Sequence, residues 1–142
     1  MNQLRMSKKS KQSPGLTNKQ ALVMNLLGKT KGPLSAYAIL DQLHDSGFRG
    51  PVQVYRALEK LMELGLVHRL ESLNAFVACQ QRTCDHQSKK TIIFTICEIC
   101  GSVQEFVNTG LEHLVRSLEK DIDFLTNRSV IELKGICSTC KD

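Results

Sequence analysis

Two cysteine pairs constrain the fold of this chain more than any other part of its sequence. Two residues separate Cys97 from Cys100, and the same spacing separates Cys137 from Cys140. A C-x₂-C turn holds two sulfur atoms about 3.7 Å apart, close to the edge of a tetrahedron whose Zn–S bonds are about 2.3 Å long. The two pairs therefore predict one closed Cys₄ site for structural zinc, with no open coordination position.

The distance between the pairs constrains the second half of the chain. Cys100 and Cys137 are separated by 36 residues, more than the roughly 15–20 of a simple zinc ribbon. A helix and a strand must therefore fold inside the module that the metal holds. Two redox-active C-x₂-C motifs are the alternative, although two of them in so small a unit would be unusual. Zinc at such a site contributes on the order of 10 kcal/mol to folding.

The hydropathy pattern bears on the cellular compartment. No apolar run approaches the roughly 18 residues of a membrane span, and the polar N-terminus lacks the apolar core of a secretory signal. We therefore expect a cytoplasmic protein with no membrane partner. In that compartment the cysteines serve as ligands or thiols rather than as disulfides.

Charge is distributed unevenly along the 142 residues. Residues 1–40 contain seven Lys and Arg and no acidic residue, whereas residues 91–142 contain five basic and eight acidic residues. This gradient indicates that one end of the chain faces a polyanion, although a solubilising tail would give the same pattern. Residues 1–15 lack any apolar period and are expected to form a disordered basic tail.

The segment 16–80 has the pattern of three helices and a hairpin. Apolar residues recur at helical spacing after each of three start signals, and a glycine follows each run. The start signals are Thr17, Ser35 and Pro51, and the expected stops are Gly28, Gly47 and Gly65. Two short strands are expected at 66–70 and 75–79. Three helices with a trailing hairpin form the winged helix-turn-helix layout.

The remaining chain has a different organisation. Residues 81–90 are polar and are expected to form a hinge. Strands are predicted at 91–96, 103–107 and 130–133, with a helix over about 110–125. The sequence thus predicts an α+β protein in which a winged-helix domain (16–80) and a small α/β domain (91–142) are joined by this hinge.

The third helix has the side chains of a DNA reader. Gln53, Arg56 and Lys60 lie opposite its apolar face, and Tyr55 lies on the flank. Arginine can bind guanine with two hydrogen bonds, glutamine suits adenine, and tyrosine or lysine can hold phosphate. In a helix-turn-helix protein the N-terminal part of this helix enters the major groove. The alternative is an ordinary solvated helix face.

A second group of metal-binding side chains surrounds the hinge. One thiolate, two imidazoles and one carboxylate are available there, from Cys79, His68, His86 and Glu105. A metal site that bridges the hinge would make the orientation of the domains depend on the metal, as in a sensor. Asp85 or Cys84 could replace His86 as the fourth ligand.

Together these motifs resemble the ferric uptake regulator family of bacterial metal-dependent repressors, from about residue 16 to residue 140. The resemblance lies in Pro51-x-x-Val54-Tyr55-Arg56-Ala57-Leu58, the wing with Cys79, Cys97-x-x-Cys100-Gly101, and Cys137-x-x-Cys140. Within the family the chain is most similar to the zinc uptake branch, through Ser35-Ala36-Tyr37 and Val67-His68-Arg69-x-Glu71-Ser72-x-Asn74.

The resemblance implies a zinc-loaded homodimer that binds palindromic operators and represses zinc-uptake genes, with 91–142 as the dimerisation domain. It implies two zinc ions per protomer, one structural and one regulatory. The structural ion would bind Cys97, Cys100, Cys137 and Cys140, and the regulatory ion His68, Cys79, His86 and Glu105. Tyr37 and Arg56 would contact bases, and Tyr55 would lie beside the DNA backbone.

Other functions are open to such a chain. An iron or manganese sensor could use the same fold, but a thiolate ligand favours zinc over manganese, which prefers oxygen ligands. A peroxide sensor needs an iron site rich in His and Asp, which the hinge does not offer. A zinc enzyme needs an open coordination position and a general base, and no catalytic zinc motif or phosphate-binding loop is found, so we expect no catalysis and no small-molecule substrate. A protein-interaction module that uses the wing for other partners is a further alternative.

Overall fold

The computed structural model describes residues 15–80 and 91–141. The predicted basic tail and the predicted hinge, with Cys84, Asp85 and His86, therefore lie outside the described residues, apart from Gly15. Within the described ranges, no helix combines the length and the apolar character that are needed to cross a membrane.

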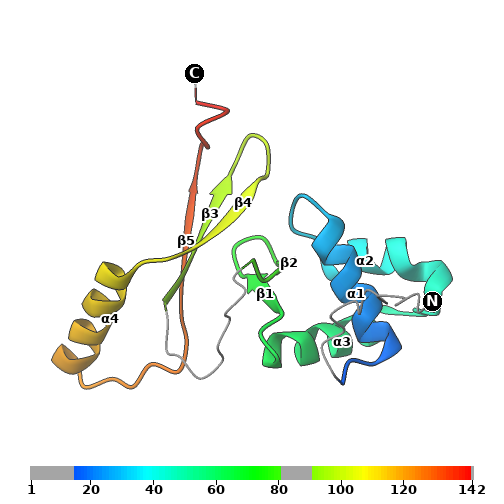
Figure 1. Ribbon diagram of the computed structural model, residues 1–142, viewed down its shortest axis with the longest axis horizontal. Coiled ribbons are helices and arrows are strands. Elements are labelled where there is room, and N and C mark those ends of the chain that lie inside the picture. Colours follow the sequence, from blue (N-terminus) through cyan, green and yellow to red (C-terminus); the bar gives the residue numbers. More distant parts are fainter. Residues whose placement is uncertain (1–14, 81–90, 142) are drawn as a thin grey trace, which may run out of the picture.

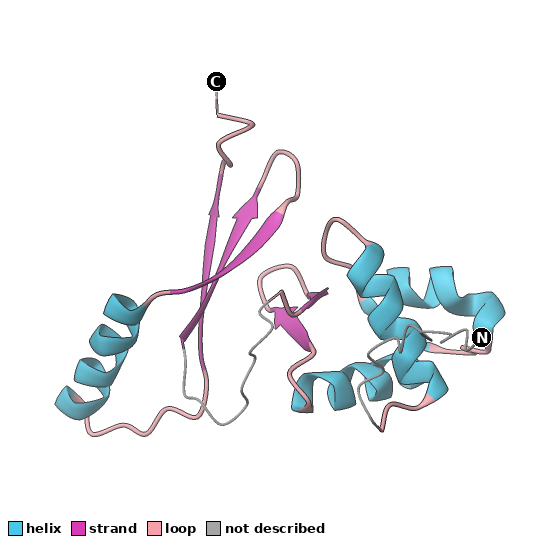
Figure 2. Ribbon diagram, viewed as in Figure 1, coloured by secondary structure: helices cyan, strands magenta, loops and turns pink. Residues whose placement is uncertain are grey.

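The first part of the chain forms three helices and a hairpin (Figures 1 and 2). The elements are α1 (Asn18–Lys29), α2 (Ala36–Leu43), a 3₁₀ turn (His44–Ser46), α3 (Pro51–Glu63), β1 (Val67–Leu70) and β2 (Ala75–Ala78). The strands pair antiparallel, and Leu34 adds a short bridge to Phe76 in β2. This is the predicted winged helix-turn-helix arrangement.

Local sequence explains most helix boundaries. Thr17 and Gln20 form a capping box at the start of α1, and Ser35 caps α2 by accepting a hydrogen bond from the Ala38 amide. Gly65, with φ of 64°, follows α3 as expected. The prediction that Gly28 stops the first helix is wrong, because α1 continues through it to Lys29.

The second part of the chain is a three-stranded sheet with one helix. Its elements are β3 (Thr91–Cys97), β4 (Val103–Val107), α4 (Thr109–Asp121) and β5 (Ser129–Gly135), and the strand order is β4-β3-β5. β4 pairs antiparallel with β3 and carries the chain back to the end of the sheet where β3 begins. β5 starts at this same end after α4, so it pairs parallel with β3.

Two predicted boundaries differ here. The helix ends at Asp121 rather than near residue 125, since Asp123 adopts a left-handed conformation (φ 52°) and the Phe124 amide bonds back to the Glu119 carbonyl. The last strand is longer than expected and extends to Gly135, where its carbonyl accepts a hydrogen bond from the Glu98 amide.

Two apolar clusters hold the molecule together. The larger one fills the space between the three helices and the hairpin, with Val23, Ile39, Leu58 and Leu61 fully buried. The smaller one joins the hairpin to the sheet and consists of Leu70, Val77, Phe94, Ile96 and Val103. The hairpin of β1 and β2 is the wing, and it thus has a packed apolar contact with the second part of the chain. We call this contact the joint.

The predicted fold class is therefore confirmed. The chain is an α+β protein in which a winged helix precedes a small α/β unit that holds a cluster of four cysteines.

Candidate metal centres and DNA-facing surface

The four paired cysteines converge at one end of the sheet. Their sulfur atoms all lie within 4.8 Å of one another. Cys97 ends β3, Cys100 lies in the turn to β4, and Cys137 and Cys140 follow β5. Cys100 Sγ and Cys137 Sγ are 3.7 Å apart, which is about the edge of a ZnS₄ tetrahedron. The donor set and its spacing therefore fit a four-coordinate zinc ion.

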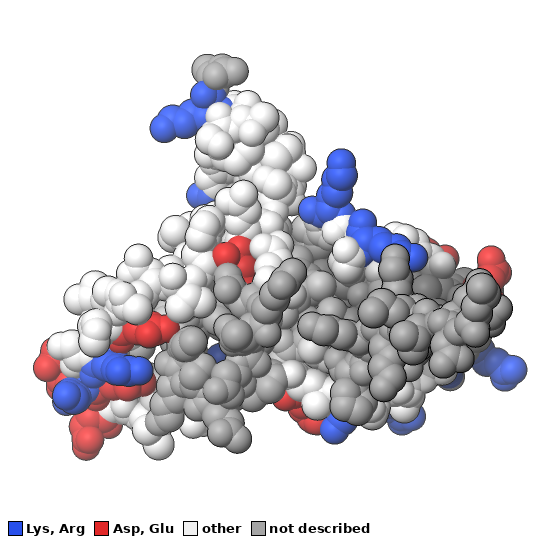
Figure 3. All heavy atoms as spheres, in the orientation of Figure 1, with Lys and Arg blue, Asp and Glu red and all other residues white. Residues whose placement is uncertain are grey.

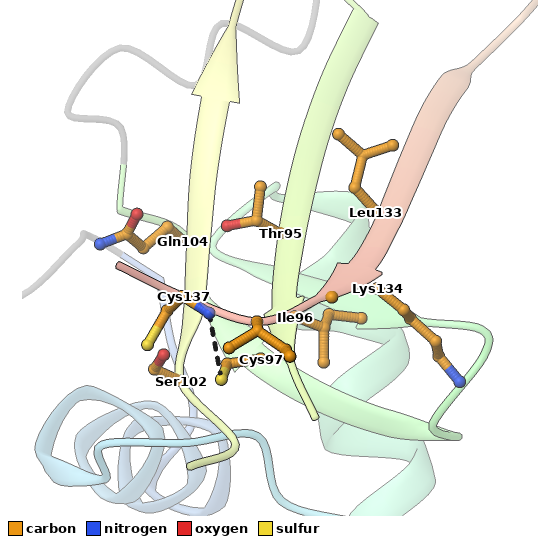
Figure 4. A pocket seen from close by; sticks show the side chains of 10 residues that line it. Thr95, Ile96, Cys97, Ser102, Gln104, Leu133, Lys134 and Cys137 are labelled. Carbon is orange, nitrogen blue, oxygen red and sulfur yellow. Dashed lines mark hydrogen bonds between the residues drawn. The ribbon is translucent and has the colours of Figure 1, made fainter. Parts of the chain in front are cut away.

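Backbone amides near the cluster donate to one of these sulfurs and favour the thiolate form, which binds metal cations. The amide of Cys137 donates to Cys97 Sγ at 3.4 Å, and the contact is drawn in Figure 4. The backbone amides of Cys100 and Cys137 lower the pKa of Cys97 to about 6, which favours its thiolate. The side chain of Cys137, together with burial, raises the pKa of Cys140 to about 12. Four crowded thiols release their protons fully only when a metal ion neutralises them.

A hydroxyl next to this cluster was not anticipated from the sequence. Cys100 Sγ lies 3.2 Å from Ser102 Oγ, and this contact is the main cause of a lowered pKa of Cys100. Ser102 also lines a pocket that continues from the cluster over the outer face of the sheet, beside Thr95 and Gln104 (Figure 4). Its place directly after Gly101 in the first knuckle is the signal that could have drawn attention to it.

A second metal-binding group lies at the joint. The ligand atoms of His68, Cys79 and Glu105 also lie within 4.8 Å of one another. His68 Nε2 is 3.6 Å from Glu105 Oε1, and Cys79 Sγ is 3.9 Å from the same oxygen. Three of the four predicted regulatory ligands are thus brought together, and the fourth, His86, lies outside the described residues.

These three side chains come from both parts of the chain. His68 is in β1 and Cys79 directly follows β2, whereas Glu105 is in β4. His68 and Glu105 are 5% and 7% exposed, respectively. Burial raises the pKa of Glu105, while a hydrogen bond from the Gln80 amide opposes the shift. A buried imidazole, a sulfur and a carboxylate suit a divalent metal, which would offset the cost of burying the charge.

The redox state of Cys79 matters for this site. The residue is disulfide-bonded in this structure, so the expectation that the cysteines serve as ligands or thiols rather than as disulfides is wrong for Cys79. Its sulfur therefore becomes a metal ligand only after reduction to the thiol, since the thiolate is the form that binds metal.

The candidate DNA-contacting residues lie on an open surface. Tyr37, in the first turn of α2, is 63% exposed, and Tyr55 in α3 is 37% exposed. Arg56 and Lys60 are exposed on the same helix, where Lys60 Nζ lies 3.4 Å from Glu63 Oε2. The opposite face of α3 is buried in the core, as its apolar period predicts.

Gln53 has a structural contact as well. Its Oε1 accepts a hydrogen bond from the Arg49 amide at 2.9 Å, just before α3 begins. The helix has Gly50 at its N-cap, with no side-chain cap of its own. Gln53 therefore stabilises the turn that leads into α3. Its side-chain NH₂ group remains available to donate a hydrogen bond to a base or a phosphate.

Charged side chains of both signs lie over both parts of the molecule. On the face shown in Figure 3, acidic and basic side chains lie together over the region of α4, and basic ones predominate over the three-helix part. Apolar residues recur at helical spacing along α4, and none of them is fully buried among the described residues. Of this apolar stripe, Leu114 and Leu118 are 67% and 57% exposed, and Ile122, directly after the helix, is 58% exposed.

These features define a class of protein. It is a winged-helix protein in which a group of metal-binding side chains lies at the joint between the wing and a second unit, and a group of four cysteines lies at one end of the sheet of that unit. The chain belongs to the ferric uptake regulator family, whose model matches residues 15–134.

Within this family the chain is similar to proteins described as zinc uptake regulators. The zinc uptake regulation protein of Escherichia coli (strain K12) is 36% identical over 126 residues, which cover 88% of this chain and 72% of that protein. The solved structure of a zinc uptake regulator complexed with zinc and DNA has a TM-score of 0.80 and 35% identity, and covers 88% of this chain and 82% of that one. The crystal structure of holo XcZur has a TM-score of 0.77 and 34% identity, and the match covers 88% of this chain and 85% of that one.

Proposed function

We propose that this protein is a zinc-responsive transcriptional repressor that binds palindromic operators of zinc-uptake genes as a zinc-loaded homodimer. The observation that carries the proposal is the group of His68, Cys79 and Glu105 at the joint. One ion bound there connects the wing to the sheet. Zinc would thereby select one orientation of the DNA-binding surface.

The donor atoms support zinc as the metal that is sensed. A sulfur and an imidazole beside a single carboxylate form a borderline-soft donor set, which favours zinc over manganese. The similar proteins described above as zinc uptake regulators point to the same metal. An iron or manganese sensor on the same fold is the alternative, and the metal titration below distinguishes them.

The proposal assigns two zinc ions to each protomer. The structural ion would bind Cys97, Cys100, Cys137 and Cys140, and the regulatory ion would bind His68, Cys79 and Glu105, with His86 as the proposed fourth ligand. The Cys₄ group leaves no position for a substrate or an activated water. Its role is therefore structural, and we propose no catalytic activity and no small-molecule substrate.

The same proposal assigns the DNA contacts. Arg56 would read a base in the major groove from the first turns of α3, and Tyr37 would contact a base from α2. Gln53, Tyr55 and Lys60 would contribute base or phosphate contacts beside them. Because operators lie on cellular DNA, we place this function in the cytoplasm.

Dimerisation would use the C-terminal unit. The apolar stripe of α4 is exposed, and β5 is an edge strand whose outer side is unpaired within residues 15–80 and 91–141. Exposed apolar stripes and open strand edges are surfaces on which a second chain commonly pairs. A two-fold dimer would present two α3 helices to the two halves of a palindrome.

The test is metal analysis of the purified, reduced protein combined with DNA binding at controlled free zinc. We expect one tightly held zinc per protomer and a second that is needed for tight binding to an operator selected from a random-sequence pool. Iron(II) and manganese(II) serve as parallel titrants, and a scrambled duplex serves as the DNA control. Operator binding that does not depend on zinc, or that responds better to either other metal, would reject the proposal.

A further inference from the structure

Three residues form a row across the C-terminal sheet on the side that faces the wing. Phe94 in β3 pairs with Glu105 in β4 and with Glu132 in β5. Paired residues on neighbouring strands point to the same face of a sheet. Phe94 is fully buried and belongs to the apolar cluster of the joint, so this face is the one that contacts the wing.

The two carboxylates of this row hold the hairpin at two separate places. Glu105 Oε2 accepts a hydrogen bond from the Gln80 amide at 3.1 Å, just after β2. Glu132 Oε2 accepts one from the Ser72 amide at 3.2 Å, in the turn that connects β1 to β2. The first contact lies at the base of the wing and the second at its tip, with the apolar joint between them.

Glu132 is not a solvated surface carboxylate. Its second oxygen, Oε1, is buried and has no hydrogen-bond partner among the described residues. Burying a carboxylate costs free energy unless hydrogen bonds compensate it. The Ser72 amide is the donor that the described residues supply, so the side chain is held where it can bind the wing tip.

We propose that Glu132 is a positioning residue that holds the tip of the wing on the C-terminal sheet and thereby prepares the joint for zinc. A hairpin held only at its base could rotate about the apolar contact. A hairpin held at both ends keeps His68 and Cys79 facing Glu105. Zinc then binds with less ordering of its ligands, which increases its affinity. This inference rests on the proposed function of the joint site.

The test compares Glu132→Ala with the parent in the full-length, reduced protein that holds its Cys₄ zinc. The first measurement is amide hydrogen exchange of residues 71–74. The second is the affinity of the second zinc, obtained by competition with a chelating indicator. We expect faster exchange at the wing tip and roughly tenfold weaker binding of the second zinc ion. A tenfold change corresponds to the lower end of the range of contributions for one hydrogen bond to a charged group. The Cys₄ zinc content should not change.

Two matched variants control for general effects. Ser72→Ala keeps the backbone amide and should behave like the parent. Lys134→Ala changes an exposed residue two positions further along the same face of β5 and should also behave like the parent. If Glu132→Ala lost its Cys₄ zinc, the same measurements on Glu132→Gln would decide. That variant keeps an acceptor oxygen but loses the charge, and about threefold weaker zinc binding is expected.

Parental exchange and parental zinc affinity in the Glu132 variant would overturn the inference, as would a Ser72→Ala variant equally impaired. Cys79→Ser separates this result from the proposed function. If Cys79→Ser kept the second zinc at parental affinity, the joint site itself would be wrong. If it lost that zinc while the Glu132 variant did not, only the positioning role would be rejected.

Discussion

The substitution Cys79→Ser tests whether the joint site is a zinc sensor. Cys79 supplies the sulfur among the three described donors at the joint, and it is only partly buried. A serine hydroxyl is smaller, harder and uncharged at neutral pH, so the variant keeps the approximate shape of the site but loses the thiolate. The backbone amide of residue 79, which donates to the Leu66 carbonyl at 2.8 Å, is retained.

The size of the effect follows from the ligand count. Zinc in four-ligand structural sites binds with about 10–16 kcal/mol, which is about 2.5–4 kcal/mol for each ligand. Because about 1.4 kcal/mol corresponds to a factor of ten, the loss of one ligand weakens zinc binding about 60- to 700-fold. The free zinc needed for half-maximal operator binding should rise by at least about 60-fold.

The assay is a zinc titration followed by fluorescence anisotropy of a labelled operator duplex. The variant should keep one zinc per protomer, the dimer and the parental melting temperature, because the Cys₄ cluster is a separate group of ligands that shares no residue with the joint site. A variant that responded to zinc at the parental concentration would refute the assignment of the joint. A variant that lost both zinc ions would instead indicate that the two sites do not form independently.

Three further predictions concern the rest of the molecule. Cys140→Ser should lose the structural zinc and dissociate the dimer, which metal analysis and gel filtration would detect; a zinc-replete dimer of parental affinity would contradict the Cys₄ assignment. Arg56→Ala should weaken operator binding by about 1–3 kcal/mol per half-site and relax the base preference at one position, whereas equal losses on operator and random DNA would exclude direct readout. Leu118→Glu, which places a charge in the exposed stripe of α4, should convert the dimer to a monomer by analytical ultracentrifugation while the monomer keeps its fold; an intact dimer would move the interface away from α4.

The geometry suggests why the regulatory metal would lie at the joint rather than within one domain. The apolar contact between Leu70, Val77 and Phe94 already brings the wing onto the sheet. The polar side chains around this contact are buried, and burying a charged group there costs free energy. A bound cation offsets that free-energy cost, so it stabilises the arrangement in which the wing lies on the sheet more than any arrangement in which it does not. By linkage, operator DNA should raise the affinity for zinc by the same factor by which zinc raises the affinity for DNA.

Much of this architecture could be predicted from the sequence because the signals are local. Thr17 and Ser35 cap helices by contacts that reach three residues along the chain, and Gly65 ends a helix through its own backbone angle. The C-x₂-C spacing brings two sulfurs together within one turn. The opposite faces of α3 follow from its 3.6-residue period.

Tertiary structure decided the contacts between segments that are distant in the chain. The contact of Ser72 with Glu132 joins residues 60 positions apart, and it depends on the register in which β3 pairs with β5. The sequence gives no sign of that register. The apolar stripe of α4 is equally instructive: its period predicts the helix but not what covers it, and the fold leaves Leu114 and Leu118 exposed. Periodicity determines which face of an element is apolar, whereas only the assembled chain determines which surface meets that face, because packing depends on every element at once.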